Sequence, residues 1–151
     1  MENMKIDQEF SIVVNYEEPI EKEIKKRGVS YFLFRFGKYP MGKKGRNIAI
    51  NLNLIKFEKN FNATEIIYKM EKEWMRPANL SELVSSDKLV QLSDEFPIFA
   101  LGSINRIGNN RYLYCPYLSN KRLYEQFLGY GFEKSLSARF PTICRFAAVS
   151  E

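Results

Sequence analysis

The clearest pattern in the chain is an alternation of apolar and polar positions over residues 47–57. The apolar positions are Ile48, Ile50, Leu52 and Leu54, and the positions between them are Ala49, Asn51 and Asn53. A period of two is typical of a strand that is buried on one side. Residues 29–36 are apolar on both faces, which is typical of a central strand. The two patterns together predict a hairpin of 29–36 with 47–57.

A period of three to four over residues 63–74 predicts an amphipathic helix. Its apolar stripe consists of Ile66, Ile67, Met70 and Trp74, which share one face of a helix. Asn62 precedes the pattern and Glu65 follows three residues later, which is the spacing of a capping box. We expect this helix to lie across the apolar face of strand 47–57.

A second helix is predicted directly after a corner at Arg76-Pro77. Pro77 lacks an N–H and disfavours the helical conformation at Arg76, so the preceding helix must end there. Asn79 and Glu82 repeat the capping-box spacing and restart a helix. The pattern places Trp74 beneath this corner.

The rest of the chain predicts an α+β fold with an antiparallel sheet, two to three helices and a turn-rich C-terminal half. Residues 10–16 favour a strand, and Pro19 and Gly28 bound a short helix. Further strands are expected at 98–104, 112–118, 123–128 and 142–149, with turns of Gly, Asn and Ser between them. Residues 1–151 form one expected domain, with a strand-helix-hairpin portion at 1–61 and the helical corner plus antiparallel portion at 62–151.

Composition supports a folded chain of modest size. The 151 residues are 45% hydrophobic and 15% aromatic, which suits one domain and argues against disorder. The chain has no apolar run of membrane-spanning length, and residues 1–9 lack the features of a signal peptide, so we expect a cytoplasmic protein. Cys115 and Cys144 stand far apart and are interpreted as reduced packing residues.

The sequence favours no catalytic, metal or cofactor chemistry. It contains no histidine, which removes the usual general base and most zinc sites. Residues 37–43 fit the G-x-x-x-x-G-K spacing of a phosphate loop, but Lys44 stands where Ser or Thr is required. Residues 85–88 fit S-x-x-K without its companion motifs, and a helix cap at Ser86 or Asp87 explains them better. We predict that the protein is not an enzyme.

Residues that favour binding gather in the last third of the chain. The candidate contacts are Asn105, Arg106, Asn109, Asn110, Arg111, Tyr112, Tyr114, Arg122, Tyr124 and Tyr130. Such residues supply contact area and adaptable hydrogen bonds, although they also form the turns of irregular sheets. The leading hypothesis is a recognition module that contacts a protein or a glycan.

A basic loop supports a second hypothesis. Its residues are Lys38, Lys43, Lys44 and Arg46, in a chain of net charge +5. A basic surface suits nucleic acid or another acidic partner. The alternative function is a small basic inhibitor or regulator, such as a mobile-element anti-defence protein, that acts on nucleic acid or on a nucleic-acid enzyme.

Several segments together resemble a known group of sequences. These are W-M-R-P-A-N-L-S-E-L at 74–83, F-P-I-F-A-L-G-S at 96–103, C-P-Y-L at 115–118, R-L-Y at 122–124 and R-F-A-A-V at 145–149. They resemble short uncharacterised bacterial proteins with the pattern R-P-A-T-x-x-E-L, F-P-I-V-A-L-G-S, R-F-A-A-V-R, a resemblance that implies no activity. More distantly, the chain is similar to C-type-lectin-like bacterial domains, which display ligand-binding residues on irregular loops. Asn79 stands where both patterns have threonine.

Overall fold

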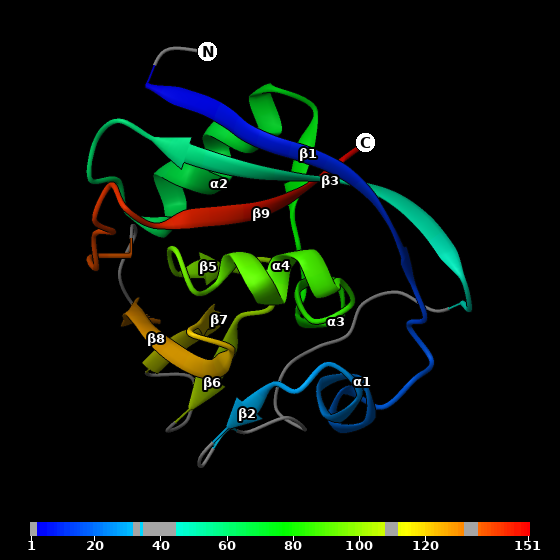
Figure 1. Cartoon of the computed structure of the whole chain (residues 1–151). Helices are drawn as coiled ribbons and strands as arrows, with labels where there is room; N and C mark the ends of the chain where they lie inside the picture. The colour runs from blue at the N-terminus through cyan, green and yellow to red at the C-terminus, as the bar shows by residue number, and fades with distance from the viewer. Residues whose placement is uncertain (1–2, 32–33, 35–44, 108–111, 132–135) are drawn as a thin grey trace.

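The computed structural model describes residues 3–31, 34, 45–107, 112–131 and 136–151. Its strands form one sheet in the order β1 (Met4–Val14), β3 (Ile48–Phe57), β9 (Arg145–Ser150), β5 (Ile98–Phe99), β7 (Tyr112–Ser119), β8 (Arg122–Tyr130) and β2 (Ser30–Tyr31). Two further strands lie beside this path. β6 (Asn105–Ile107) lies beside β7 (Figure 1), and β4 (Met75–Pro77) pairs with β9. The helices are α1 (Ile20–Lys26), α2 (Ala63–Lys72), α3 (Leu80–Leu83) and α4 (Asp87–Leu92). The fold is therefore mixed α+β, as predicted.

The sheet is mixed, so the prediction of an antiparallel sheet was wrong. β5 runs parallel to β9, and β2 runs parallel to β8, while the other pairs are antiparallel. Both parallel pairs involve strands of two residues, and so short a segment carries no pattern that fixes its direction. The described residues also contain four helices where two to three were expected, because Ser86 caps a separate helix, α4, through a hydrogen bond to the Leu89 N–H.

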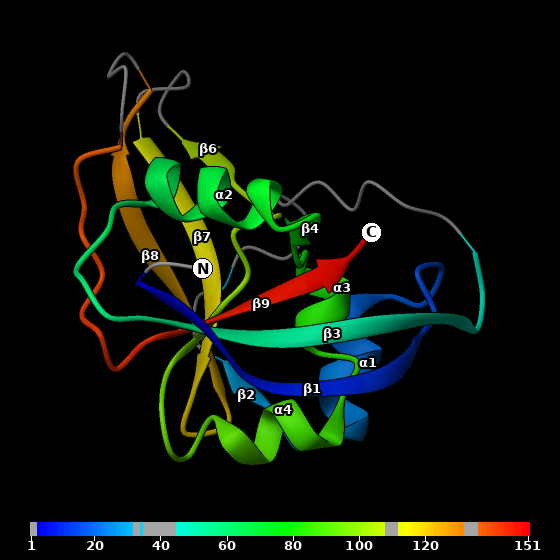
Figure 2. The same ribbon diagram turned by 90° about the horizontal axis from the view of Figure 1, so that it is seen from above.

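The helices cover both faces of the sheet. Figure 2 shows α2 on one side of β3 and β9, with α4 on the other. Ile24 of α1 packs in the same core as Leu89 of α4. The core on the α1 side contains Leu52, Leu54, Ile98 and Leu118 from the sheet, with Ile24, Leu83 and Leu89 from the helices. The core on the α2 side contains Ile55, Phe57 and Phe146, with Ile66 and Met70. The sheet therefore has two separate cores.

This arrangement corrects two predictions about β3. The helix α2 does not cover the face that carries Leu52 and Leu54, because it packs on the opposite face with Ile55 and Phe57. The strand that pairs antiparallel with β3 over its whole length is β1, with Val14 opposite Ile48 and Met4 opposite Phe57. The described part of the segment 29–36 instead forms β2, at the far end of the sheet. An alternating pattern identifies a buried face, but any apolar surface of matching length can cover it.

Both predicted capping boxes are confirmed. The Asn62 side chain accepts from the Glu65 N–H at 2.9 Å, and the Asn62 N–H donates to the Glu65 carboxylate at 3.1 Å. The corresponding distances for Asn79 and Glu82 are 3.0 and 2.8 Å. Each box pairs two backbone N–H groups that would otherwise lack an acceptor at the start of the helix.

Trp74 does not pack beneath the corner as predicted. The helix α2 ends at Lys72, and Trp74 adopts a left-handed conformation with φ of 59° that turns the chain into β4. Its side chain is 80% exposed. A helix stripe predicts burial only up to the residue where the helix ends, and here the helix ends before Trp74.

The corner is held against the segment that follows β5. The Gly102 N–H donates to the Ala78 carbonyl at 2.8 Å, and a Cβ on Gly102 would lie 2.6 Å from the carbonyl oxygens of both Pro77 and Ala78. The Ser103 hydroxyl accepts from the Leu80 N–H at 2.8 Å. The Gly-Ser pair of the resemblance therefore has a packing role in this chain, since only glycine allows this approach.

Candidate recognition surface

The corner contains a buried carboxylate, Glu82, which is a candidate for acid–base chemistry. Glu82 is fully buried, and its Oε1 accepts from Arg76 at 2.9 Å and from the Asn79 N–H at 2.8 Å. Its Oε2 accepts from Arg76 at 2.6 Å and from the Tyr16 hydroxyl at 2.5 Å. Burial opposes ionisation, but these hydrogen bonds outweigh it and lower the pKa of Glu82. Four donors occupy the positions at which a carboxylate accepts, so Glu82 supports the fold and is not placed for acid–base work.

The cysteines are buried and reduced, which agrees with their interpretation as packing residues. Burial raises the pKa of Cys144 to about 11 and raises the pKa of Cys115 well above its usual range. Thiols with such pKa values form little thiolate at neutral pH and are poor nucleophiles. Within the described residues, no group of three or more Cys, Asp or Glu side chains is arranged to hold a metal ion.

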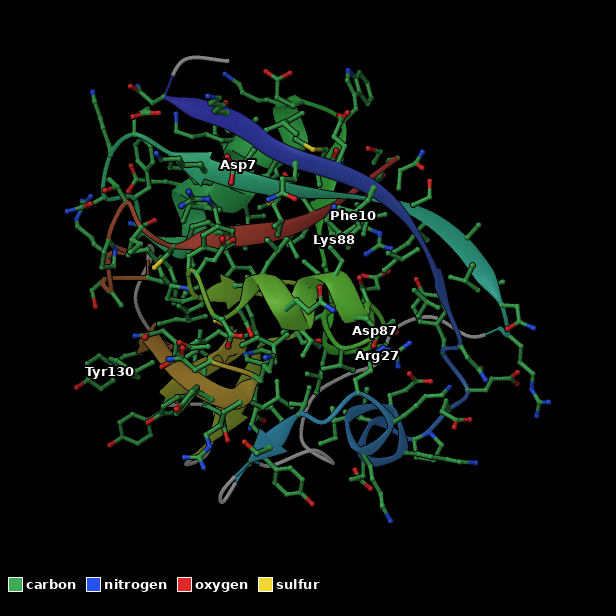
Figure 3. The ribbon with its side chains drawn as sticks, viewed as in Figure 1. Asp7, Phe10, Arg27, Asp87, Lys88 and Tyr130 are labelled. Atoms are coloured by element: carbon green, nitrogen blue, oxygen red, sulfur yellow. The ribbon has the colours of Figure 1, made fainter. Side chains whose placement is uncertain are left out.

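Four aromatic side chains gather at one end of the β7–β8 hairpin, and we call them the tyrosine patch: Tyr112, Tyr114, Phe127 and Tyr130. Phe127 lies 5.6 Å from Tyr114, 5.3 Å from Tyr130 and 6.5 Å from Tyr112 between ring centroids, and Tyr112 lies 5.7 Å from Tyr130. None of the four belongs to either core. Tyr112 is 39% and Tyr130 is 40% exposed, and Tyr130 projects outward from the ribbon (Figure 3).

A bulge in β8 brings these rings onto one face. Leu113 lies opposite Gly129 and Tyr114 lies opposite Phe127, so Leu128 is an extra residue on β8. In a regular strand, residues 127 and 130 would point to opposite faces. The extra residue reverses this alternation, which places Phe127 and Tyr130 together. Gly129 at the bulge has φ of 151°, a conformation that favours glycine.

A buried amide lies in the strand beside the patch. Asn105 stands opposite Tyr114 in the β6–β7 pair and is 3% exposed. Side chains of directly opposite residues in an antiparallel pair lie on the same face, so Asn105 belongs to the face that carries the patch. Its side-chain nitrogen has no hydrogen-bond partner among the described residues. Most buried donors are paired, so this one marks an unusual position.

The other predicted contacts on the hairpin lie away from the patch. Tyr124 stacks on Tyr117 at 5.2 Å, and Tyr117 stacks on Phe99 at 4.6 Å, which leads into the core on the α2 side. Arg122 lies at the opposite end of β8 and donates to the Ser30 hydroxyl at 3.3 Å. The predicted site is therefore divided, because Tyr124 lies on the opposite face of the hairpin and Arg122 lies at its far end.

The hairpin turn itself is attached to the fold. Asn120 and Lys121 have φ of 50° and 58°, as in a type I′ turn. The Asn120 N–H donates to the Ser93 carbonyl at 2.7 Å, and the Lys121 N–H donates to the Ser93 hydroxyl at 2.9 Å. Lys121 also pairs with Asp94 at 2.8 Å. This turn is therefore not a free recognition loop.

Several predicted residues lie outside the described part of the chain. These are Asn109, Asn110 and Arg111 of the predicted recognition loop, and Lys38, Lys43 and Lys44 of the basic loop. Arg106 is placed in β6, opposite Leu113. Arg46 pairs with Glu17 at 3.0 Å, so this cation already has an acidic neighbour. The nucleic-acid hypothesis stays a prediction.

Sequence reasoning missed Phe127 as a member of the patch. Its neighbours Leu123 and Leu128 are core residues, and a regular alternation gives no reason to place Phe127 beside Tyr130. Gly129 within a strand was the available signal, because a glycine there often marks a bulge.

No protein-family model, curated protein or solved structure matches this chain. Among the described residues, no helix has both the length and the apolar character needed to cross a bilayer.

Proposed function

We propose that this protein is a non-catalytic recognition module that binds a protein partner through the tyrosine patch. The observation that carries the proposal is the gathering of four aromatic rings outside both cores, with Tyr112 39% and Tyr130 40% exposed. Tyrosines that are held by their neighbours give a large contact area at a small entropic cost. Exposed apolar surface that is concentrated in one place is a common mark of an interface.

The arrangement of the rings favours a protein over a single-stranded nucleic acid. The patch pairs meet at interplanar angles between 54° and 72°. Bases bind single-stranded nucleic-acid sites by stacking on open aromatic faces, and tilted rings present edges and hydroxyls instead. Such a mixed surface suits the varied side chains of a protein.

The proposal modifies what the lectin-like resemblance implies. Lectin-like domains display their ligand contacts on irregular loops, whereas the patch proposed here lies on the paired strands β7 and β8. Side chains on paired strands are held more rigidly than those on loops, which lowers the entropic cost of binding.

The test compares two exposed tyrosines. Tyr130→Ser removes a patch ring, and Tyr68→Ser removes a ring that is 59% exposed on α2. Proteins captured from a lysate of the source cells by the wild-type chain are purified, and their affinities are measured by calorimetry. We expect Tyr130→Ser to weaken the genuine partner about 30-fold, as for a binding hot spot of about 2 kcal/mol, with Tyr68→Ser unchanged.

Two outcomes would contradict the proposal. One is a partner that binds Tyr130→Ser and the double variant Tyr112→Ser/Tyr130→Ser as tightly as the wild type. The other is retention of a nucleic acid or an oligosaccharide in place of a protein, which a salt titration and a glycan array would reveal, since phosphate contacts weaken steeply with salt.

A further inference from the structure

The strand β3 is longer than its neighbour β9. It pairs with β1 from Ile48 to Phe57, but its pairing with β9 covers only Leu52 to Ile55. Residues 48–51 therefore have a strand on one side and, within the described residues, none on the other. In an antiparallel pair, alternate residues direct their N–H and C=O groups away from the partner. This stretch therefore presents an open backbone edge.

A groove of about 550 Å³ runs along this edge. One wall is formed by Ile48, Ala49, Ile50 and Asn51, and the other by Arg76, Val149, Ser150 and Glu151. Successive side chains of a strand point to opposite faces of the sheet. Four consecutive residues can line the same groove only along their shared backbone edge.

The groove continues the place of β9 in the strand order. Val149 lies between Leu52 of β3 and Arg76 of β4. Beyond it, the Glu151 N–H donates to the Trp74 carbonyl at 3.0 Å, so the chain follows β4 and leaves β3 unpaired. The groove therefore lies between residues 48–51 of β3 and the end of the chain that stays alongside β4.

We propose that this edge binds an extended peptide segment of a partner protein, which adds to β3 as a strand. Main-chain hydrogen bonds to an open edge give affinity in this mode of recognition, and alternate side chains give selectivity. The partner segment is separate from the surface that contacts the tyrosine patch, because β3 and β8 lie in different parts of the sheet (Figure 1).

The groove walls specify the chemistry of the segment. Ile48, Ile50 and Val149 lie on the face toward α1, and Ile48 is 41% exposed. The opposite face carries Ala49, Asn51 and Ser150. The added strand therefore alternates branched apolar residues, which cover the isoleucines, with small hydroxyl-bearing residues, which face the asparagine and the serine.

The β3 strand of a second copy of this chain does not fit the same place. It would bring its own β1 along the far edge, at the spacing of one strand. That strand would fall where β4 and Trp74 already lie. The groove thus suits a single strand that has both of its own edges free.

The probe for this inference is a capped eight-residue peptide in which valine and threonine alternate between terminal lysines. Amide hydrogen exchange of the full chain is followed by NMR with and without the peptide. We expect alternate amides within residues 48–51 to exchange at least tenfold more slowly when it is bound, with β7 amides unchanged. A peptide of the same composition, with its three valines followed by its three threonines, should give no such protection.

Paired variants test the side-chain wall. Ile48→Asn should weaken the alternating peptide about tenfold, whereas Val13→Asn should leave it unchanged, because Val13 is 57% exposed on β1 and does not line the groove. Equal protection by both peptides, or no protection at millimolar peptide, would overturn the inference. Protection without peptide that rises with protein concentration would assign the edge to a second copy and would overturn it too.

Discussion

The corner around Glu82 and the tyrosine patch differ in how completely their polar groups are hydrogen-bonded. At the corner, four donors fill the accepting positions of one carboxylate, and Gly102 allows two backbone segments to meet. At the patch, rings remain partly exposed, and the Asn105 amide has no partner among the described residues. The first region is complete without a ligand and stabilises the fold. The second keeps exposed ring surface that a partner can contact, beside a buried amide.

The largest expected effect comes from breaking the corner at its carboxylate. Glu82→Gln keeps the shape of the side chain but removes the negative charge that holds Arg76. It also replaces one accepting oxygen with an NH2 group, which then faces the other donors. Breaking one partner of a buried ion pair costs about 3–5 kcal/mol. Urea unfolding should show a loss near the lower end, because the Arg76 side chain is 21% exposed. The exposed substitution Glu95→Gln is the control, and a loss below about 1 kcal/mol for Glu82→Gln would show that the network is dispensable.

A methyl group at Gly102 should have the next largest effect. A Cβ there would meet two carbonyl oxygens at 2.6 Å, and separating the two segments costs about 2–3 kcal/mol. Gly28→Ala is a useful contrast, because nothing lies within 4 Å of its Cβ but its φ is +70°. That substitution should cost about 1 kcal/mol through the backbone alone. Equal losses of melting temperature would contradict the packing argument.

Local patterns predicted the parts of the fold that depend on neighbouring residues. Both capping boxes, the Pro19–Gly28 helix and strands β3, β7, β8 and β9 follow from spacing, and the structure places them close to the predicted positions. The strand predicted at 98–104 is wrong in extent, because β5 covers only Ile98–Phe99. Predictions that required a tertiary partner were less successful. The face covered by α2, the pairing of 29–36 and the burial of Trp74 were wrong, because each depends on where distant segments lie.

The candidate site was predicted in part for the same reason. Tyr112, Tyr114 and Tyr130 were identified by residue type, and the structure brings them together with Phe127. The structure places Tyr124 and Arg122 away from this group, because a one-residue bulge in β8 changes which face its residues point to. Residue type thus indicates binding capacity, whereas register decides which residues act together.

Two buried asparagines allow the contrast between corner and patch to be measured directly. Asn79 is 7% exposed and caps α3, while Asn105 is 3% exposed and its amide nitrogen is unpartnered in the described part of the chain. Asn79→Leu should destabilise the protein by about 1–2 kcal/mol through loss of the cap. Asn105→Leu should be neutral or stabilising by about 1 kcal/mol, because an unpaired buried amide is removed. Parallel urea titrations of the two variants provide the measurement, and a loss at Asn105 as large as at Asn79 would reveal a native hydrogen bond at that amide.

The smallest expected effect is a pH dependence of the stability that the corner contributes. Burial and the hydrogen bond to Glu82 raise the pKa of Tyr16 to about 12, from an ordinary value of 10.0. Because the pKa is higher in the folded chain, the contribution of the Tyr16 hydroxyl to the free energy of unfolding is fully present below pH 10. It is lost as the pH rises from 10 toward 12. The stability advantage of the wild type over Tyr16→Phe should therefore shrink by about 1 kcal/mol between pH 9 and pH 11.

The other tyrosines ionise in both proteins, so their effects cancel in the difference between the wild type and Tyr16→Phe. This includes Tyr117, whose pKa is also raised by burial. A constant difference between Tyr16→Phe and the wild type would mean that the Tyr16 hydroxyl ionises alike in the folded and unfolded chains. In that case the corner would owe its stability to the Arg76–Glu82 pair and the Asn79 cap, without a contribution from the strand-end tyrosine.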